Sequence, residues 1–138
     1  MKRFVLISCV SKKLPYRAKA KDLYTSTLFK KNMEYAQTLN PENIFILSAK
    51  YGLLDLEQEI GPYNQTLKEM SSLERKTWAN KVLEKLNKVA NLKQDEIIFL
   101  AGKSYRQYLI PHITHYRIPL EKMGIGKQLK FLKEKTNE

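Results

Sequence analysis

The chain places small hydroxyl, thiol and amine side chains directly after its first apolar run, residues 4–8. These side chains belong to Ser8, Cys9, Ser11, Lys12 and Lys13. Lysine supplies a mobile positive charge and serine a short donor, a combination suited to binding a phosphate or a carboxylate. An ordinary solvated turn fits the same residues. Cys9 is either a small buried thiol or a nucleophile, and a nucleophile would need a base such as His112 or His115.

A second group of chemically able residues follows the next apolar run. It holds Ser48, Lys50, Tyr51, Gly52, Asp55 and Tyr63. Asp55 lies between two leucines, and a carboxylate near apolar groups can act as a base or stabilise a developing cation, with Lys50 beside it. The two tyrosines could stack on a nucleobase. The alternative is that Asp55 caps a turn while the tyrosines pack, and both interpretations stay open.

Two further junctions combine glycine with lysine. Gly102 and Lys103 follow the third apolar run, and Gly124, Gly126 and Lys127 precede the last amphipathic segment. Glycine at such a junction exposes backbone N–H groups to an anion. Neither junction has the Gly-x-x-x-x-Gly-Lys-Ser/Thr spacing of a phosphate-binding P-loop. We therefore treat them as anion-binding candidates of a different kind.

The elements that must position these residues alternate along the chain. Continuous apolar runs predict buried strands at residues 4–8, 44–47, 97–101 and 116–118. Helical spacing predicts helices at residues 25–39, 71–92, 105–110 and 124–135. Thr25 or Ser26 is the expected cap of the first helix, and Ser71 and Glu74 form a capping box. The predicted buried stripe of the second helix is Leu73, Trp78, Val82, Leu86 and Val89. Residues 48–68 read as a loop.

This alternation predicts the fold class. We expect a single compact α/β domain over residues 1–138, with three layers and a mostly parallel, doubly wound (Rossmann-like) sheet of about four strands between flanking helices. In such sheets ligands bind beyond the carboxyl ends of the strands. The four junctions should therefore meet in one pocket.

Composition narrows the function further. The 138 residues carry 25 Lys and Arg against 14 Asp and Glu, a net charge of +11. Such an excess attracts polyanions, although a lysine-rich surface kept for solubility gives the same number. One cysteine excludes an intrachain disulfide and a cysteine-based zinc site. No apolar run is long enough for a membrane span or a signal peptide, so a cytoplasmic protein without membrane contact is expected. No metal and no cofactor are expected.

The motifs together resemble two related groups of proteins. Residues 47–55 followed by Pro62 and Tyr63 resemble the signature of the peroxide-stress protein YaaA family. A group of short bacterial and phage domains of unknown function is similar over almost the whole chain. It shares a Ser-Cys-x-x-Lys-Lys start, the Asp-Leu-Tyr at residues 22–24, the Ser-Ala-Lys-Tyr-Gly-Leu at residues 48–53, a Gly-x-x-Tyr and a Gly-x-Gly-x-Gln-Leu. This second resemblance adds Tyr24 and Tyr105 to the candidate binding residues.

The first resemblance implies a link to DNA, to oxidative stress and, distantly, to base-handling proteins such as DNA glycosylases. The longer insertions of that family, including its helix-hairpin-helix-like element, are missing from this sequence. Three hypotheses follow. In the first, the chain handles a nucleobase, nucleotide or nucleic-acid end, and cleavage of an N-glycosidic bond with Asp55 is its candidate reaction. Otherwise it is a non-catalytic nucleic-acid-binding module, or an accessory protein that binds a partner through its basic surface.

Overall fold

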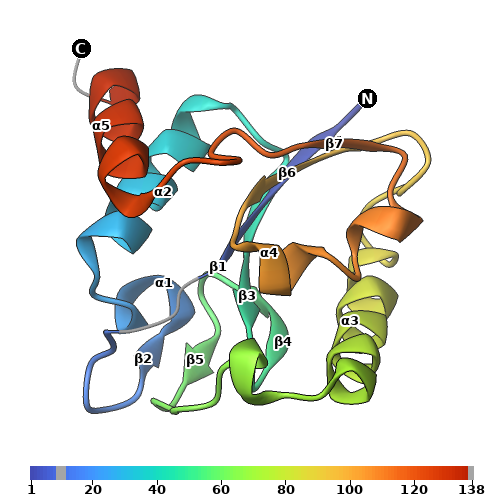
Figure 1. Cartoon of the computed structure of the whole chain (residues 1–138), viewed down its shortest axis with the longest axis horizontal. Coiled ribbons are helices and arrows are strands. Elements are labelled where there is room, and N and C mark those ends of the chain that lie inside the picture. Colours follow the sequence, from blue (N-terminus) through green and yellow to red (C-terminus); the bar gives the residue numbers. More distant parts are fainter. Residues whose placement is uncertain (9–11, 137–138) are drawn as a thin grey trace.

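A five-stranded sheet runs through the centre of the molecule (Figure 1). The computed structural model describes residues 1–8 and 12–136. In space the strand order is β4 (Gly52–Asp55), β3 (Asn43–Ser48), β1 (Arg3–Ser8), β6 (Glu96–Leu100) and β7 (His115–Arg117). All neighbouring pairs are parallel except β3 and β4. The four predicted strands are confirmed, and β4 is an addition.

Helices cover both faces of this sheet (Figure 1). One face carries α1 (Ala20–Leu23), α2 (Thr27–Thr38) and α5 (Ile125–Thr136). The other carries α3 (Ser72–Leu86), α4 (Lys103–Arg106) and the 3-10 turns η1 (Leu67–Glu69) and η2 (Ile110–His112). Two short strands, β2 (Ala18–Lys19) and β5 (Glu59–Ile60), pair beside α1. The predicted three-layer α/β fold is therefore confirmed.

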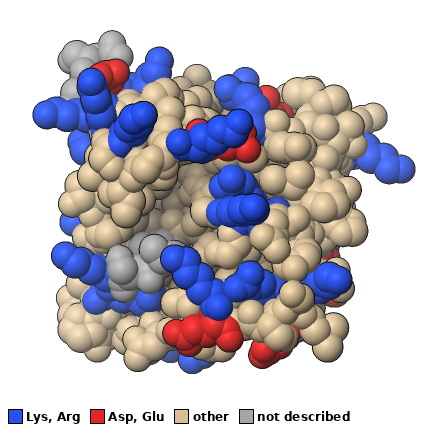
Figure 2. Space-filling view, in the orientation of Figure 1, with Lys and Arg blue, Asp and Glu red and all other residues tan. Residues whose placement is uncertain are grey.

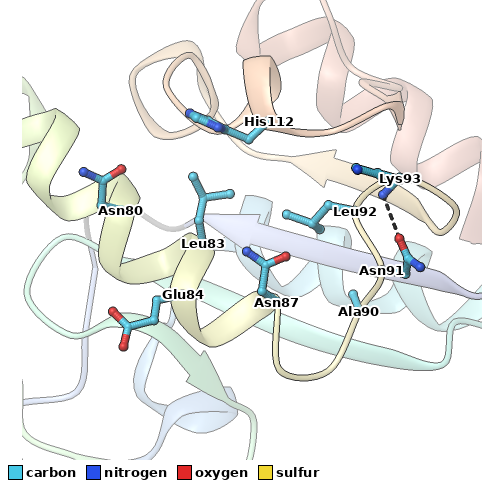
Figure 3. Close-up of a pocket in the computed structure, with 9 residues that line it drawn as sticks. All are labelled: Asn80, Leu83, Glu84, Asn87, Ala90, Asn91, Leu92, Lys93 and His112. Carbon is cyan, nitrogen blue, oxygen red and sulfur yellow. Dashed lines mark hydrogen bonds between the residues drawn. The ribbon is translucent and has the colours of Figure 1, made fainter.

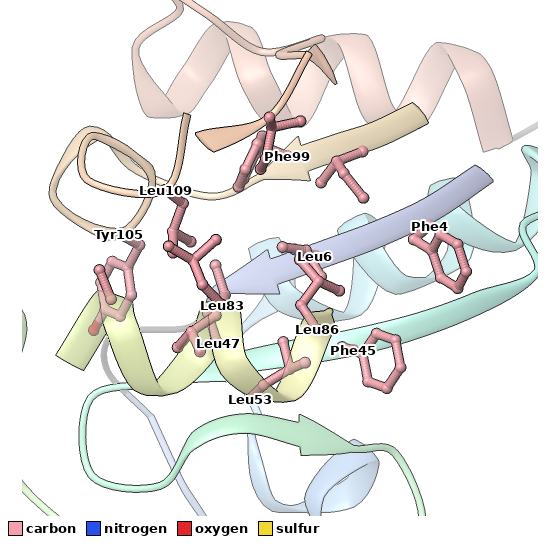
Figure 4. Packing of buried hydrophobic residues seen from close by; sticks show 14 of the residues in the cluster. Phe4, Leu6, Phe45, Leu47, Leu53, Leu83, Leu86, Phe99, Tyr105 and Leu109 are labelled. Carbon is pink, nitrogen blue, oxygen red and sulfur yellow. The ribbon is translucent and has the colours of Figure 1, made fainter. Parts of the chain in front are cut away.

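The continuous apolar strands supply two cores at once. Phe4 and Leu6 of β1 point into the core beneath α3, which Figure 4 shows, whereas Val5 and Ile7 point into the core beneath α2 and α5. All four are at most 2% exposed. Burying one such side chain stabilises the fold by about 1.5–3 kcal/mol, which is why a central parallel strand has no polar side.

Helix starts follow the predicted caps. The Ser26 hydroxyl accepts a hydrogen bond from the Phe29 amide (3.2 Å) at the start of α2. At the start of α3, the Glu74 amide donates to Ser71 (3.1 Å) and the Ser71 amide donates to Glu74 (2.9 Å). Both Ser26 and the capping box are confirmed as helix caps.

The end and the buried face of α3 differ from the prediction. The helix ends at Leu86 rather than at residue 92, so Val89 lies beyond it and is 48% exposed. Leu73 is 74% exposed, because it precedes Trp78 by five residues and so lies about 140° around the helix. The buried stripe is Trp78, Ala79, Val82, Leu83 and Leu86.

Residues 48–68, predicted to be a loop, contain regular structure. After β3 the chain turns within three residues and returns as β4, antiparallel to β3, with Ser48 paired to Gly52. Gly52 has φ +77°, a left-handed conformation that glycine adopts without a steric penalty. The hairpin adds an outer strand that a run of only four residues did not reveal.

The hairpin generates a stability prediction. Gly52→Ala should lower the free energy of unfolding by about 1–2 kcal/mol, because any Cβ strains a left-handed residue. Gly126→Ala is the matched control: Gly126 lies in α5 without a positive φ, and an added Cβ would meet nothing within 4 Å. That control should gain up to about 1 kcal/mol. Urea unfolding of both variants measures the difference, and equal effects would contradict the assigned backbone strain.

Candidate anion-binding cleft

The sheet topology singles out the carboxyl ends of β1 and β6. These two strands are neighbours and parallel, with Ile7 paired to Leu100. The chain leaves β1 towards β3 on one side and leaves β6 towards β7 on the other. The two connections therefore diverge and open a crevice, the place where open α/β sheets bind ligands.

A cleft of about 720 Å³ lies at this point. Ser8 at the end of β1 lines it together with residues 99–102 of β6 and its following turn. Leu28 and Asn32 of α2, residues around α4, and the segment between β7 and α5 complete the walls. Figure 2 shows the hollow near the middle of the molecule, with Lys and Arg side chains around it. Its size suits a small-molecule ligand.

Positive charge dominates the lining of the cleft. Five basic side chains line it: Lys68, Arg75, Lys103, Arg106 and Lys122. Glu121 is the one acidic side chain among the described lining residues. In the part of the chain that the structure describes, none of the five basic groups forms a salt bridge, although seven salt bridges occur elsewhere. Among the described residues, therefore, no salt bridge compensates the positive charge of these five side chains.

The two arginines are held by backbone carbonyls. Arg106 Nη1 donates to the Ala101 carbonyl (2.7 Å), next to the end of β6. Arg75 Nε donates to the Leu67 carbonyl (2.7 Å) and its Nη2 to the Lys68 carbonyl (3.1 Å). Because a guanidinium carries five N–H donors, both arginines keep further donors after these bonds. They are thus fixed in position while still able to bind an anion.

Acidic groups at the opposite edge of the sheet already have partners within the protein. The Asp95 carboxylate accepts hydrogen bonds from the amides of Asn91 (2.8 Å) and Lys2 (3.0 Å), which lower its pKa. Glu96 pairs with Arg3 (2.9 Å) and Arg117 (3.1 Å). The two edges therefore differ: acids and bases compensate one another at the amino edge, whereas bases are in excess at the carboxyl edge.

One polar side chain in the wall of the cleft is buried without a partner for its oxygen among the described residues. Asn32 of α2 lines the cleft and is only 4% exposed. Its Oδ1 has no hydrogen-bond partner among the described residues. A buried acceptor without a partner is rare in folded proteins, because it costs about 1–3 kcal/mol of stability.

The third junction forms the floor between β1 and β6. The Gly102 amide donates to the Ser8 hydroxyl (3.3 Å), so this N–H already has a partner inside the protein. An added Cβ on Gly102 would meet nothing within 4 Å, which marks open space beside the turn. Lys103 is exposed at the cleft, and Tyr105 is buried edge-on against Trp78, with 5.8 Å between ring centroids.

The fourth junction forms the opposite wall. Gly124, Gly126 and Lys127 are exposed around the first turn of α5. Their neighbours Met123, Ile125 and Gln128 line the cleft. Gln128 Nε2 donates to the Met123 carbonyl (2.9 Å), which holds this side chain in place. Of the predicted candidates, Ser8, Gly102, Lys103 and Tyr105 thus line the cleft, whereas Gly124, Gly126 and Lys127 are not among its lining residues.

The second junction builds a separate group, the tyrosine–lysine cluster of Lys13, Tyr24, Lys50, Tyr51 and Tyr63. The Tyr24 and Tyr63 hydroxyls are 2.6 Å apart, and the Tyr51 and Tyr63 rings meet edge-on at 5.6 Å. Lys13 Nζ lies 4.5 Å from the Tyr63 ring centroid and Lys50 Nζ lies 5.3 Å from that of Tyr51. Cation–π contacts therefore already occupy the tyrosine rings on which a base was predicted to stack.

Ser48 has a structural position beside this cluster. It is fully buried; its hydroxyl accepts from the Tyr51 amide (3.0 Å) and its carbonyl from Trp78 Nε1 (2.8 Å). Together with Gly52 it shapes the hairpin. The described residues that line the 720 Å³ cleft include neither of them.

Asp55 lies away from both groups. It pairs with Phe45, three residues back from the end of β3, so it is about 10 Å from the carboxyl edge along the strand. Its exposed carboxylate lies 3.8 Å from Lys85 Nζ. The predicted proximity of Asp55 to the pocket is wrong, because the expected loop forms an antiparallel strand that carries Asp55 back towards the amino edge.

The remaining candidates lie after β1. Lys12 is exposed, and its carbonyl accepts a hydrogen bond from the Thr25 amide (2.9 Å). Cys9 and Ser11 lie outside the described residues. Their proposed contact with an anion therefore stays a prediction.

The sequence did not predict most of the basic residues that line the cleft, nor the buried Asn32. The missed lining residues are Asn32, Lys68, Arg75, Arg106, Lys122 and Gln128. Asn32 had a detectable signal, since it follows Leu28 by four residues and so shares the inward face of the predicted helix. Arg75 and Lys68 had none, because only the packing of α3 and η1 brings them to the end of β6.

Other hollows have a different character. One of about 730 Å³ lies between the end of α3, the segment leading to β6 and η2 (Figure 3). Its charged lining residues are Glu84 and Lys93, with His112 at the rim. A smaller one of about 450 Å³ lies beside Lys50 and Trp78. Neither gathers an excess of positive charge comparable with that of the cleft between β1 and β6.

The described residues contain no group of three or more His, Cys, Asp or Glu side chains arranged to hold a metal ion. No helix among them combines the length and the apolar character needed to cross a membrane.

The comparisons with known proteins identify a family but no activity. No curated protein matches the chain. A family model described as a family of unknown function, DUF6884, matches residues 4–134 and so covers all the strands and helices around the cleft except the first and last residues. The chain is a member of the DUF6884 family.

Proposed function

We propose that the protein binds the phosphate of a nucleotide, or of a nucleic-acid end, in the cleft between β1 and β6. One observation carries this proposal: five basic side chains line a cleft at the divergence point of the sheet, and none of them has an acidic partner in the described structure. An unpaired positive site favours an anionic ligand, since the ligand supplies the missing charge.

The shape of the site supports a phosphate with an organic group attached. Guanidinium groups such as those of Arg75 and Arg106 can donate two parallel hydrogen bonds to one phosphate, and the lysines add point charges. Apolar side chains also line the cleft, among them Leu28, Leu100 and Met123, and a bare inorganic ion would not use them. A nucleotide offers both a charged end and a flat apolar end.

The tyrosine–lysine cluster extends this proposal to nucleic acid. Lys13 and Lys50 follow the carboxyl side of β1 and β3, on the same sheet edge as the cleft. A strand whose end occupies the cleft could continue over these lysines. The resemblance to the YaaA family supports a nucleic-acid ligand in the same way. We also propose a cytoplasmic location, and a binding role without catalysis.

Removing charge from the cleft should weaken phosphate binding. In the double variant Lys103→Gln/Lys122→Asn, affinity for adenosine 5′-monophosphate should fall by at least about tenfold, since even one hydrogen bond to a charged group contributes about 1.5–3 kcal/mol. Asparagine suits position 122 because Lys122 has φ 67°. Isothermal titration calorimetry measures the change.

The matched control removes the same charge at the other edge. Lys88→Gln/Lys93→Gln alters two exposed lysines beyond α3, near the amino end of β6, and should leave the affinity unchanged. Binding of a short single-stranded oligonucleotide should also depend less on salt in the cleft variant. The slope of log K against log salt concentration should become shallower by about 0.7 for each lost phosphate contact. Equal losses in both double variants would show that binding depends only on net charge and would exclude the cleft.

A second function, cleavage of an N-glycosidic bond, is favoured by one observation: an acidic side chain, Glu121, lines the otherwise basic cleft. Such cleavage needs a carboxylate near the sugar to stabilise the developing positive charge or to activate water. Asp55 cannot serve the cleft from β4, so we propose Glu121 for this role.

A direct assay separates these two carboxylates. If the protein releases free base from a nucleotide or oligonucleotide, Glu121→Gln should reduce the rate at least about 100-fold, a typical contribution of acid–base catalysis. Asp55→Asn should leave the rate unchanged. Chromatographic detection of free base measures it. Full activity of Glu121→Gln would reject this mechanism, and absence of base release from the unaltered protein would leave binding alone as the function.

A further inference from the structure

The residues that line the cleft form two chemically different ends, and Asn32 belongs to one of them. Its carbonyl oxygen is buried in the wall formed by α2, among side chains of the core beneath α2 and α5. Leu28, Leu100, Leu120 and Met123 line the same cleft. Four of the five basic residues instead belong to η1, α3 and α4 on the other face of the sheet. The cleft thus has an apolar end with one buried acceptor and a charged end.

A second acceptor lies in the wall formed by α5. The Gln128 amide nitrogen is used by the Met123 carbonyl (2.9 Å). Within the described residues Gln128 Oε1 therefore keeps its accepting capacity, and this residue lines the cleft too. Two residues at the apolar end thus have amide oxygens that no described group uses, and a ligand that pairs with them must bring the donors.

We infer that this end recognises a nucleobase that carries an exocyclic amino group, with Asn32 Oδ1 accepting its N–H. The inference rests on the proposed nucleotide-binding function and names the class of base. The apolar side chains contact the flat faces of the base, and the phosphate lies at the basic end. A buried acceptor that is left unpaired without ligand is paired when the amino group enters, which gives the site its selectivity.

The test compares two ligands that differ in one group. Adenosine 5′-monophosphate carries the 6-amino group, and purine riboside 5′-monophosphate has hydrogen in its place. The unaltered protein should bind the first at least about tenfold more tightly by calorimetry, because the second leaves Asn32 unpaired. Asn32→Leu has nearly the same shape without the acceptor, and it should bind the two ligands with equal affinity.

A second variant guards against a folding defect. Asn32→Asp keeps an acceptor oxygen and should retain the preference for the amino ligand, even if its added charge weakens binding of both phosphates. Thermal melting should show Asn32→Leu folded, since it removes a buried polar group that has no partner. If Asn32→Leu does not fold, the test is the ratio of the affinities of Asn32→Asp for the two nucleotides.

The outcomes separate the two levels of the proposal. Equal binding of both nucleotides by the unaltered protein, or a preference that survives in Asn32→Leu, overturns the role of Asn32 while leaving phosphate binding intact. Loss of the preference in Asn32→Asp overturns it as well. Absence of binding for both nucleotides would reject the proposed function itself, and base recognition with it.

Discussion

The parallel pairing of β1 with β6 is the constraint on which the rest of the structure depends. Five residue pairs hold these strands in register, from Arg3 with Glu96 to Ile7 with Leu100. Because the chain leaves the two strands in opposite directions, their carboxyl ends cannot be covered by one short connection. The cleft exists for this reason. The same pairing brings Ser8 within hydrogen-bond distance of Gly102, residues 94 positions apart in the sequence.

The distribution of charge gives this cleft its chemical character. Net charge alone did not distinguish a solubility device from a binding surface, since +11 fits both. The arrangement supports the proposed binding surface. Carboxylates such as Glu96 and Asp95 are placed where they meet arginine or backbone donors at the amino edge. The pKa of Tyr108 is lowered chiefly by hydrogen bonds from Ser72 and Gln107, with smaller contributions from the charges of Lys76 and Arg75.

The sequence predicted the elements whose signals are local. Strands β1, β3 and β6 are continuous apolar runs because both of their faces are buried, and the caps at Ser26 and Ser71 depend only on neighbours three residues away. Asp55 was misplaced for the opposite reason. Whether a short segment returns as an edge strand depends on its partner β3, and a loop and a three-residue hairpin have similar sequences.

The residues of the candidate site also differ in whether a local sequence signal predicts them. Gly102 and Lys103 were found because a turn after a buried strand must lie at the carboxyl edge. Arg75 was missed because its position depends on where α3 packs, which no local pattern encodes. Asn32 lies between these cases: its place on the inward face was predictable, but its lack of a partner was visible only after folding.

The central claim is that a phosphate-bearing ligand binds between β1 and β6. Amide chemical-shift mapping during titration with adenosine 5′-monophosphate tests it most directly. We expect the perturbed amides to cluster at Ser8, Asn32, residues 100–106 and residues 120–128, which line or flank the cleft. Perturbations confined to the tyrosine–lysine cluster, or to the hollow beside His112, would contradict the account, as would an unchanged spectrum.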